Sequence, residues 1–303
     1  MGKILVTGAS GFLGHACLDV LKNSDFEIFA VYKSRKGSIS SKVKWVEANL
    51  HEPKEVDKFL KEIRPEYLLH LAWDMEPGMK LDSHIHFPWV DTSMALIQKF
   101  AETNGKRVVI AGSCAEYKWG NYLYDEDTTP IQPRNSYGLS KNELHQQVAD
   151  FCNQGDLSYA WGRVFFTFGP YENKKRLVSH IVHSILKNEK VRTTHGNQVY
   201  DYLYVEDVAR AMINLLKKDF SGAVNICSGE PLKLGDLIFK IADQMNGGHL
   251  VELGALKANG DTPQYVVGRN QRLKELTGWY PQTSIDSGIQ KTIQFIKDKN
   301  HLT

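Results

Sequence analysis

A run of glycines between an apolar strand and an amphipathic helix constrains the fold more than any other feature of the chain. Lys3–Thr7 (K-I-L-V-T) is apolar and rich in β-branched residues, as a buried parallel strand requires. Residues 8–14 then read G-A-S-G-F-L-G, and apolar positions recur at helical spacing from Phe12 to Leu21. Glycine permits positive φ and a close approach of the backbone to a ligand, and the following helix offers free N–H groups to an anion. The pattern predicts a strand–turn–helix unit that binds phosphate groups.

Apolar, strand-like runs alternate with helical patterns through the first half of the chain. Strands are predicted at Ile4–Thr7, Ile28–Tyr32, Lys44–Glu47, Tyr67–Leu71, Arg107–Ala111 and Tyr159–Phe165. This alternation is typical of an α/β fold with a doubly wound parallel (Rossmann) sheet and helices on both faces. We expect residues 1–168 to form this domain, with 201–226 returning to it. Residues 169–200, with a helix over Leu177–Leu186, and residues 227–303 are expected to form a smaller C-terminal substrate-binding lobe.

A tyrosine and a lysine four residues apart, in Y-G-L-S-K, are candidates for proton transfer. Asn135 and Ser136 are typical of a helix start, and on a helix Tyr137 and Lys141 project from one face. A tyrosine in water has a pKa of about 10, which a nearby positive charge lowers. Ser113 comes just past the end of an apolar strand, where doubly wound folds place their chemistry. These three residues are the predicted catalytic group.

The glycine spacing G-x-x-G-x-x-G, the serine and the Tyr-x-x-x-Lys motif together resemble the extended short-chain dehydrogenase/reductase family, in its nucleotide-sugar branch. The resemblance covers nearly the whole chain, since residues 163–170, 201–209 and 225–229 match later family motifs. It implies that Ser113 hydrogen-bonds the reacting oxygen, that Tyr137 passes the proton and that Lys141 also contacts the nicotinamide ribose. The implied cofactor-binding residues, besides Tyr137 and Lys141, are Gly8, Ser10, Gly11, Phe12, Leu13, Gly14, Lys33, Ser34, Arg35, Asn49, Leu50, Leu71 and Ala72.

The segment after the second predicted strand bears on the choice between NAD and NADP. A carboxylate at this place would hold the ribose 2′-hydroxyl of NAD. The chain has Lys33, Ser34, Arg35 and Lys36 instead, and cations favour the 2′-phosphate of NADP(H). The sequence therefore predicts NADP(H), and a solvated basic loop is the alternative explanation.

The residues after Ser113 restrict the reaction that the resemblance allows. Dehydratases of the family carry an Asp-Glu pair directly after the catalytic residue, whereas this chain has Cys114 and Ala115. Glu116 comes one position too late, and on an alternating backbone it would face the other way. Combined epimerase/reductases place a cysteine two residues after the serine, which is absent here, and a histidine that His180 matches. A lone helical histidine is more often solvated or packed than catalytic. The reaction that these residues leave open is hydride transfer to a ketone, without dehydration or the ring-carbon epimerisation of the epimerase/reductases.

The resemblance favours an NADPH-dependent reductase of the 4-keto group of a nucleotide-linked 4-keto-6-deoxyhexose, in deoxysugar biosynthesis for surface polysaccharide. The alternatives are an NAD(P)-dependent nucleotide-sugar 4-epimerase, which uses the same catalytic residues, and a non-catalytic NADP-sensing protein. At three positions where the family contacts the substrate's diphosphate or nearby groups, the chain has Phe166, Tyr200 and Gly260, and Arg176 is a candidate replacement. The implied substrate-binding residues are Trp73, Ser113, Cys114, Arg176 and His180.

Composition argues against several other classes of protein. The net charge of +2 is too small to indicate binding to nucleic acid or to a membrane surface, and no apolar run has membrane-spanning length. Four cysteines without close pairing or metal-ligand spacing predict a reduced, cytoplasmic setting and no metal site. His84 and His86 are expected to be solvated loop residues. The resemblance also implies a homodimer formed by the helices near Asp91–Glu102 and after Tyr137.

Overall fold

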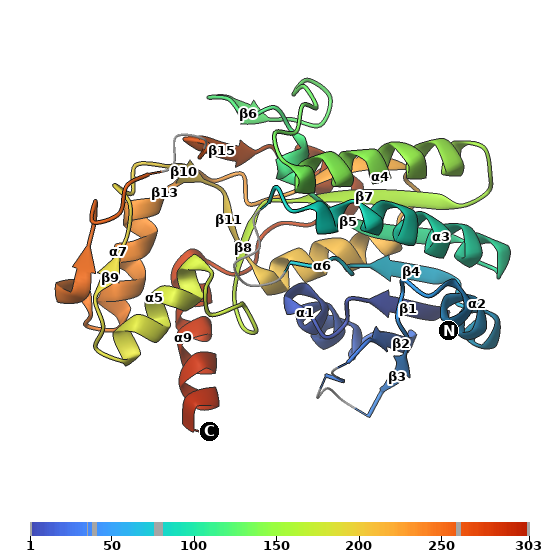
Figure 1. The fold of residues 1–303 in the computed structure, drawn as a ribbon, viewed down its shortest axis with the longest axis horizontal. Coiled ribbons are helices and arrows are strands. Elements are labelled where there is room, and N and C mark those ends of the chain that lie inside the picture. Colours follow the sequence, from blue (N-terminus) through green and yellow to red (C-terminus); the bar gives the residue numbers. More distant parts are fainter. Residues whose placement is uncertain (1, 35, 38–40, 76–80, 259–261, 302–303) are drawn as a thin grey trace.

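The computed structural model describes residues 2–34, 36–37, 41–75, 81–258 and 262–301. Its centre is a seven-stranded sheet in which every neighbouring pair is parallel, in the order β12-β7-β5-β4-β1-β2-β3 (Figure 1). The strands are β1 (Lys3–Thr7), β2 (Glu27–Tyr32), β3 (Val43–Glu47), β4 (Tyr67–His70), β5 (Arg107–Ser113), β7 (Ser158–Val164) and β12 (Gly222–Ile226). The predicted doubly wound α/β fold is confirmed.

The strand that leads to the candidate serine is longer than predicted. β5 continues past Ala111 because its pairing with β7 runs on without a break to Ser113 opposite Val164. Apolar periodicity does not detect this extension, since Gly112 and Ser113 carry no apolar side chain. Ser113 is therefore the last residue of a central strand, fixed by the backbone ladder of the sheet.

Helices cover both faces of the sheet and bury two separate apolar cores. One face holds α1 (Phe12–Leu21), α6 (Val205–Leu216) and α8 (Gln271–Thr277), and the other holds α2 (Pro53–Ile63), α3 (Pro88–Glu102) and α4 (Ser136–Asn153). α2 illustrates how the spacing of apolar residues determines which face of such a helix is buried. Val56, Phe59, Leu60 and Ile63 recur at helical spacing and are all buried, each burial contributing about 1.5–3 kcal/mol. The helix ends at Ile63, and its C-cap residue Arg64 has a left-handed φ of 51°.

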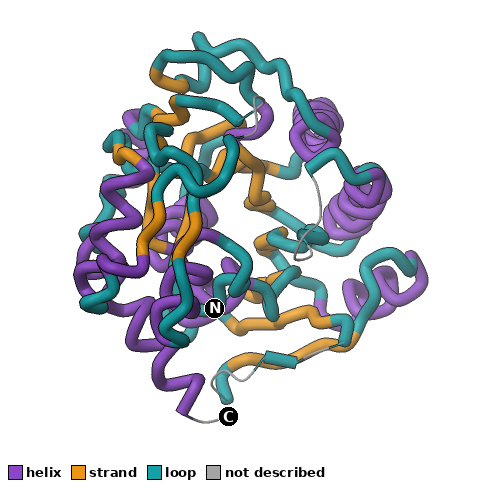
Figure 2. The backbone as a smooth tube through the Cα atoms, turned by 60° about the vertical axis from the view of Figure 1, so that its left-hand side comes forward, coloured by secondary structure: helices purple, strands orange, loops and turns teal. Residues whose placement is uncertain are grey.

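The second lobe has its own core, between a small sheet and three helices. Its four-stranded sheet, in the order β13-β10-β15-β6, is built from β6 (Leu123–Tyr124), β10 (Val199–Tyr200), β13 (Leu232–Lys233) and β15 (Tyr265–Gly268). The helices are α5 (Leu177–Leu186), with the bounds that the sequence predicts, α7 (Leu234–Gln244) and α9 (Ile285–His301). The pair β8 (Phe166–Phe168) and β11 (Tyr202–Tyr204) connects the lobes, and short strands and long loops dominate this part (Figure 2). Within the described ranges, no helix is long and apolar enough to cross a membrane.

The two lobes exchange segments in a way that the predicted division does not include. β6 comes from the range assigned to the first domain, yet it pairs with β15 in the small sheet. Leu273 of α8 and Trp279 come from the range assigned to the second lobe, yet both are buried in the core beneath α1 and α6. Trp279 Nε1 also donates a hydrogen bond to the Asp207 carbonyl at 3.1 Å. These contacts depend on pairing between segments distant in the sequence, which local patterns do not encode.

Candidate active site

Ser113 stands at the carboxyl end of β5, where a single 3₁₀ turn (Cys114–Glu116) begins. The Ser113 hydroxyl accepts a hydrogen bond from the Ala115 N–H at 3.2 Å, and the Glu116 carboxylate accepts one from the Ser113 N–H at 2.7 Å. This reciprocal capping fixes the backbone of the serine. Ser113 is buried at the edge of the sheet where the fold class places its chemistry.

α4 begins where the sequence predicts and brings Tyr137 to this turn. The Asn135 side chain caps the helix by accepting a hydrogen bond from the Gly138 N–H at 2.8 Å. Gly138 allows close packing, since a Cβ there would collide with the carbonyl oxygen of Ala115 in the serine turn. As a result the Ser113 side chain lies close enough to the Tyr137 hydroxyl to lower its pKa. Two of the three predicted catalytic residues therefore lie side by side.

The tyrosine is protonated at neutral pH. Burial of its hydroxyl raises the pKa of Tyr137 to about 12, against the opposing effect of the nearby Ser113 side chain. The negative charge of Glu116 adds to the rise, and Arg176 opposes it. The sequence predicts a pKa lowered by Lys141, and the structure differs in this respect. In this protonated form the tyrosine can donate a proton to a carbonyl oxygen.

Lys141 lies close by but makes other contacts. Its ammonium donates a hydrogen bond to the Ala111 carbonyl at 2.8 Å and sits 3.7 Å from the centroid of the Trp73 ring. Burial lowers the pKa of Lys141 to about 7. The Trp73 ring is also edge-on to Tyr137, with ring centroids 6.2 Å apart, so it contacts both members of the Tyr-x-x-x-Lys motif. Because Lys141 loses its proton near pH 7 and Tyr137 only near pH 12, the lysine is uncharged where the tyrosine titrates and does not lower its pKa.

An aromatic wall made of Trp73, His86 and Trp89 lines this side of the site. The Trp73 Nε1–H donates a hydrogen bond to His86 Nδ1 at 3.2 Å, and the Trp73 ring stacks on Trp89. His86 is fully buried and its ring lies edge-on to Tyr137, with centroids 5.3 Å apart. The expectation of a solvated His86 is therefore wrong, whereas His84 is exposed as expected. The 3₁₀ turn at His84–His86 directs His86 inward. Such a short turn has no apolar periodicity, so the sequence does not predict that this histidine is buried.

The glycine turn has the geometry that the sequence predicts. Gly8 has a φ of 66°, and a Cβ on it would come within 2.6 Å of the Ala72 N atom. A Cβ on Gly14 would collide with the Gly8 carbonyl, so these two glycines are required for packing. Gly11 differs: it is exposed at the N-terminus of α1, has a φ of −84°, and does not cap the helix with a side chain. An exposed helix N-terminus without a side-chain cap fits an anionic ligand.

The other predicted cofactor contacts lie around this turn. Ser10 is exposed, Phe12 and Leu13 are half-buried in the first turn of α1, and Leu71 follows β4 beside Gly8, its N–H bonded to the Thr7 carbonyl at 3.3 Å. After β2, Lys33, Ser34 and Lys36 are exposed, and Arg35 lies outside the described residues. Leu50 is buried. Asn49 accepts a hydrogen bond from the His51 N–H at 3.3 Å, so its side-chain oxygen is already engaged within its own turn.

The predicted substrate contacts are less uniform. Arg176 precedes α5 with its side chain 57% exposed, 3.9 Å from Glu172, and its charge reaches Tyr137. Burial raises the pKa of the Cys114 thiol to about 12, which keeps it protonated beside Ser113. His180 is exposed on α5, and within the described part of the chain no hydrogen bond or ion pair joins it to the catalytic candidates. Its catalytic role remains a prediction without support from contacts.

Aromatic side chains occupy two of the three positions at which the sequence departs from the resembled family. Phe166 and Tyr200 stack with ring centroids 4.3 Å apart. Tyr200 is buried and its hydroxyl donates to the Pro263 carbonyl at 2.8 Å. Gly260 lies outside the described residues. Asp201, next to Tyr200, is structural, since its carboxylate accepts from the N–H groups of Ser228 and Gly229.

Sequence reasoning missed the buried polar groups behind the site. Glu116 pairs with Arg163 of β7, and His70 links Thr7 and Ser93 at 2.7 and 2.9 Å. Burial lowers the pKa of His70 to about 3, so this histidine is neutral. A charged residue within an otherwise apolar segment indicates a buried ion pair, but the sequence does not show which residue of opposite charge is its partner. Across the described ranges, no cluster of three or more potential metal ligands is present.

Comparisons with known proteins identify the family. The model of the NAD dependent epimerase/dehydratase family matches residues 4–227. A putative UDP-glucose 4-epimerase of Methanocaldococcus jannaschii is 24% identical over 98% of this chain and 99% of its own. A dTDP-6-deoxy-L-talose 4-dehydrogenase (NAD(+)) of Aggregatibacter actinomycetemcomitans is 28% identical over 77% and 86%. The structure of the Thermotoga maritima UDP-glucose 4-epimerase with UDP-glucose has a TM-score of 0.89 at 19% identity, covering 98% of this chain and 99% of that one. The predicted resemblance is confirmed: the chain belongs to the NAD dependent epimerase/dehydratase family.

Proposed function

We propose that this protein is a nicotinamide-dependent oxidoreductase that acts at C4 of a nucleotide-linked sugar. The observation that carries the proposal is the buried Ser113 at the end of β5, beside a Tyr137 whose pKa of about 12 keeps it protonated. Such a pair can hold a carbonyl oxygen and give it a proton. Family membership supports the nicotinamide cofactor, and the names of the relatives support a UDP- or dTDP-linked sugar.

Each group of candidate residues would have a distinct role in the reaction. The glycine turn of residues 8–14 would hold the cofactor's phosphates on the exposed N-terminus of α1. When bound, the nicotinamide supplies or accepts the hydride. Ser113 orients the substrate oxygen, and Tyr137 donates its proton during reduction and takes one during oxidation. Lys141 supplies a positive charge beside them, and the aromatic wall excludes water from this side.

A 4-epimerase is the first candidate. Two of the three relatives described are UDP-glucose 4-epimerases that match this chain over nearly its whole length. In such a reaction the hydride leaves C4 and returns to the opposite face, so the same Tyr137 must remove the proton and give it back. Ser113, Tyr137 and Lys141 suffice for this chemistry, and no further acid or base is required.

A 4-ketoreductase, favoured by the sequence alone, is the second candidate. Tyr137 is prepared for proton donation, and the loop after β2 exposes Lys33 and Lys36, which suits NADPH. The 4-dehydrogenase from Aggregatibacter actinomycetemcomitans, whose name gives NAD(+) as its cofactor, supports redox chemistry at C4 with net cofactor turnover. The names of the other relatives favour the epimerase more, and for that reason the reductase comes second.

One assay separates the candidates. The purified protein is given UDP-glucose, UDP-galactose and a panel of nucleotide-linked 4-keto-6-deoxysugars made in situ by 4,6-dehydratases, with NADH or NADPH. Sugar interconversion without net loss of absorbance establishes an epimerase. Steady loss of absorbance with a keto sugar establishes a reductase. Saturable cofactor binding with neither reaction would contradict both and favour a cofactor-sensing protein.

We also propose that the protein is a cytoplasmic homodimer. α3 and α4 lie side by side on one face of the first lobe (Figure 1), and the resemblance implies that these helices meet their counterparts in a second copy. Sedimentation equilibrium at micromolar concentration would show twice the monomer mass of 34.4 kDa. A monomer at that concentration would contradict the proposed assembly.

A further inference from the structure

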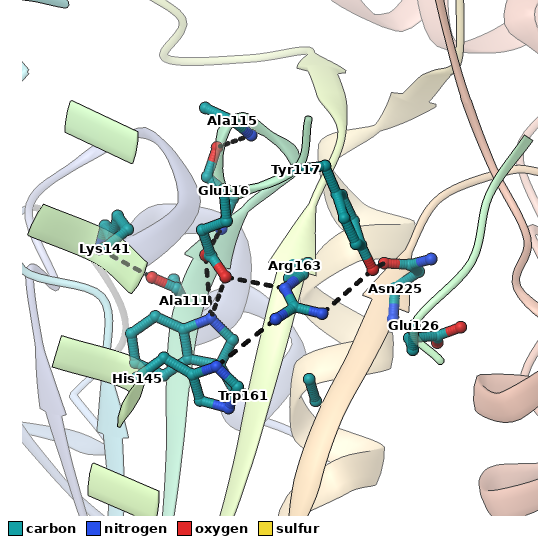
Figure 3. A network of polar contacts seen from close by, with 12 residues as sticks. Ala111, Ala115, Glu116, Tyr117, Glu126, Lys141, His145, Trp161, Arg163 and Asn225 are labelled. Atoms are coloured by element: carbon teal, nitrogen blue, oxygen red, sulfur yellow. Dashed lines mark hydrogen bonds and ion pairs between the residues drawn. The ribbon is translucent and has the colours of Figure 1, made fainter. Parts of the chain in front are cut away.

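A carboxylate with no access to solvent lies directly behind the serine turn. Glu116 is fully buried, and among the described residues the hydrogen-bond donors to its oxygens are N–H groups (Figure 3). The Ser113 N–H donates at 2.7 Å, Trp161 Nε1 at 2.9 and 3.0 Å to the two oxygens, and Arg163 Nε at 2.8 Å. One of these donors is the backbone of the candidate catalytic serine itself. The charge of Glu116 is therefore tied to the residue that holds the substrate oxygen.

The arginine that balances this charge is held equally firmly. Arg163 is 3% exposed, and its Nη1 donates to the Tyr117 hydroxyl at 3.1 Å. Tyr117 in turn donates to the Asn225 side chain at 2.8 Å, and Arg163 Nη2 lies 3.5 Å from Nδ1 of His145 (Figure 3). The contacts connect the serine turn to β7, β12 and α4. Together these contacts hold the Arg163 guanidinium in one orientation, and its hydrogen bond in turn holds the Glu116 carboxylate in place.

The backbone next to the serine packs directly on this pair. A Cβ on Gly112 would collide with Trp161 Nε1 and approach the Glu116 carboxylate to 2.8 Å. The last residue before Ser113 therefore has to be glycine for the strand to lie against the carboxylate. A shift of Glu116 would change the position of Ser113 through both its N–H and this contact.

Such a buried pair is a poor device for stability alone. Removing two charges from water costs several kcal/mol per ion, and apolar replacements of buried pairs are often neutral or stabilising. The pair lies behind the serine turn, and its link to the chemistry is the position of that turn and the field that its charge exerts there.

We propose that Glu116, oriented by Arg163, is a positioning residue for the reaction: it fixes the backbone of Ser113, and its negative charge keeps the proton on the groups that surround the substrate oxygen. The activity measurements that test this proposal rest on the proposed function. The structural measurement that tests it rests on the hydrogen bonds alone. The role proposed for Glu116 acts through Ser113 and requires no contact of its own with the substrate or the cofactor.

The sign of the charge effect follows from the groups around Tyr137. The negative charge of Glu116 raises its pKa, whereas Arg176 and the nearby Ser113 side chain lower it. The aromatic wall on the other side brings His86 edge-on to Tyr137. Neutralising Glu116 therefore lowers the pKa of Tyr137 and moves its loss of the proton to lower pH.

Lys141 responds in the same direction. Burial and the charge of Glu116 act oppositely on its pKa, Glu116 raising it. Its other neighbours are the Ala111 carbonyl, the Trp73 ring and neutral His70. The alkaline limb of the pH–rate profile for carbonyl reduction therefore moves to lower pH without Glu116, whichever of Tyr137 and Lys141 it reports.

Two substitutions separate position from charge. Glu116→Gln keeps the size but removes the charge, and we expect kcat to fall by up to about 10²-fold and the alkaline limb to move to lower pH. Glu116→Asp keeps the charge but shortens the reach to the Ser113 N–H, so kcat falls while the limb stays. Glu126→Gln is the matched control, because Glu126 accepts the Asn225 N–H at 2.7 Å at the far end of the same region (Figure 3). It should leave both readouts unchanged.

The controls also separate this proposal from the proposed function. KM and the Kd of the cofactor should change less than kcat in both Glu116 variants. A folded Glu116→Gln protein with the wild-type kcat and pH profile would overturn the proposal, and if that variant does not fold, a fully active Glu116→Asp protein would do so. If the wild-type protein turns over no sugar, the proposed function fails. Hydrogen exchange of the peptide that contains Ser113 then decides: faster exchange in the Glu116 variants than in Glu126→Gln supports the positioning role, and equal protection contradicts it.

Discussion

Tyr137 owes its protonation to where α4 begins. The helix start at Ser136 brings the ring against the serine turn, and burial then raises its pKa to about 12. Tyr137→Phe removes the transferable proton but keeps the ring contacts with Trp73 and His86. We expect turnover to fall by about 10²–10⁴-fold while the Kd for NAD(P)H stays near its wild-type value. Steady-state kinetics and fluorescence titration measure the two quantities, and near-normal turnover would refute the assigned proton donor.

Lys141 gives a prediction about stability. Its pKa is about 7 in the folded protein, against about 10.4 in an unfolded chain, so the unfolded chain binds more protons between these values. The contribution of this lysine to stability therefore rises with pH across that window. Lys141→Met removes the buried charge, so we expect a higher Tm than wild type at pH 7 and a smaller difference at pH 9.5. Scanning calorimetry at the two pH values tests this, and a constant difference would contradict the lowered pKa. The same variant should be inactive.

At the residue scale the sequence predicts identities better than environments. Ser113, Tyr137 and Lys141 are identified by motif and spacing, and the structure brings them into one place. The ammonium's contacts with Ala111 and Trp73 were not predicted, because they depend on packing between distant segments. Burial, which dominates each shifted pKa here, is a property of the assembled fold and not of a motif.

The strand–turn–helix unit at the start of the chain contains glycines of two kinds. Gly14 is required for packing, since a Cβ there would meet the Gly8 carbonyl, whereas Gly11 is exposed and a Cβ there would lie 3.1 Å from the same atom. Gly14→Ala should therefore lower the Tm and abolish cofactor binding. Gly11→Ala should keep the Tm but weaken NAD(P)H binding at least about tenfold, because its Cβ would stand where phosphates approach. Thermal unfolding and titration measure both, and unchanged affinity in Gly11→Ala would mean that the cofactor does not approach this glycine.

The loop after β2 should decide between the two nicotinamide cofactors. Lys33 is exposed there, and no carboxylate stands among the described residues 33, 34, 36 and 37. Lys33→Asp should raise the Kd ratio of NADPH to NADH by about tenfold, which corresponds to about 1.4 kcal/mol. Lys257→Asp, an exposed lysine of the second lobe, is the control for a general charge effect. An unchanged ratio would show that the loop is only a solvated basic surface.

Elements were more predictable in the first lobe than in the second. The strands of the central sheet are continuous apolar runs between turns, and β2 and β4 lie within one residue of their predicted ends. The short strands of the small sheet, such as β6 and β10, contain two residues each and carry no periodicity. Their pairing depends on the opposite strands β13 and β15, and no local pattern in the sequence gives that order.

The predicted active site is divided between the two lobes, because the glycine turn lies in one and the predicted sugar site extends into the other. Activity should therefore depend on how firmly the two lobes are held together. Tyr171 connects them: its ring stacks on His15 of α1, with centroids 3.8 Å apart, and packs against Phe295 of α9 at 4.6 Å. Lys299 of the same helix lies 4.4 Å from the ring centroid. The contact therefore joins the helix that begins at the glycine turn to the last helix of the chain.

Removing this ring should loosen the lobes without touching the catalytic residues. Aromatic pairs contribute about 0.5–1.5 kcal/mol each beyond the area they bury, so Tyr171→Ala should lower the Tm by a few degrees. It should also raise the KM for the sugar substrate more than the Kd for the cofactor, because α1 alone carries the turn. Tyr171→Phe retains both ring contacts and serves as the control for the unusual backbone, where φ is 66°. Equal KM values in the Ala and Phe variants would show that the lobes are held together by their other contacts, above all the pairing of β8 with β11.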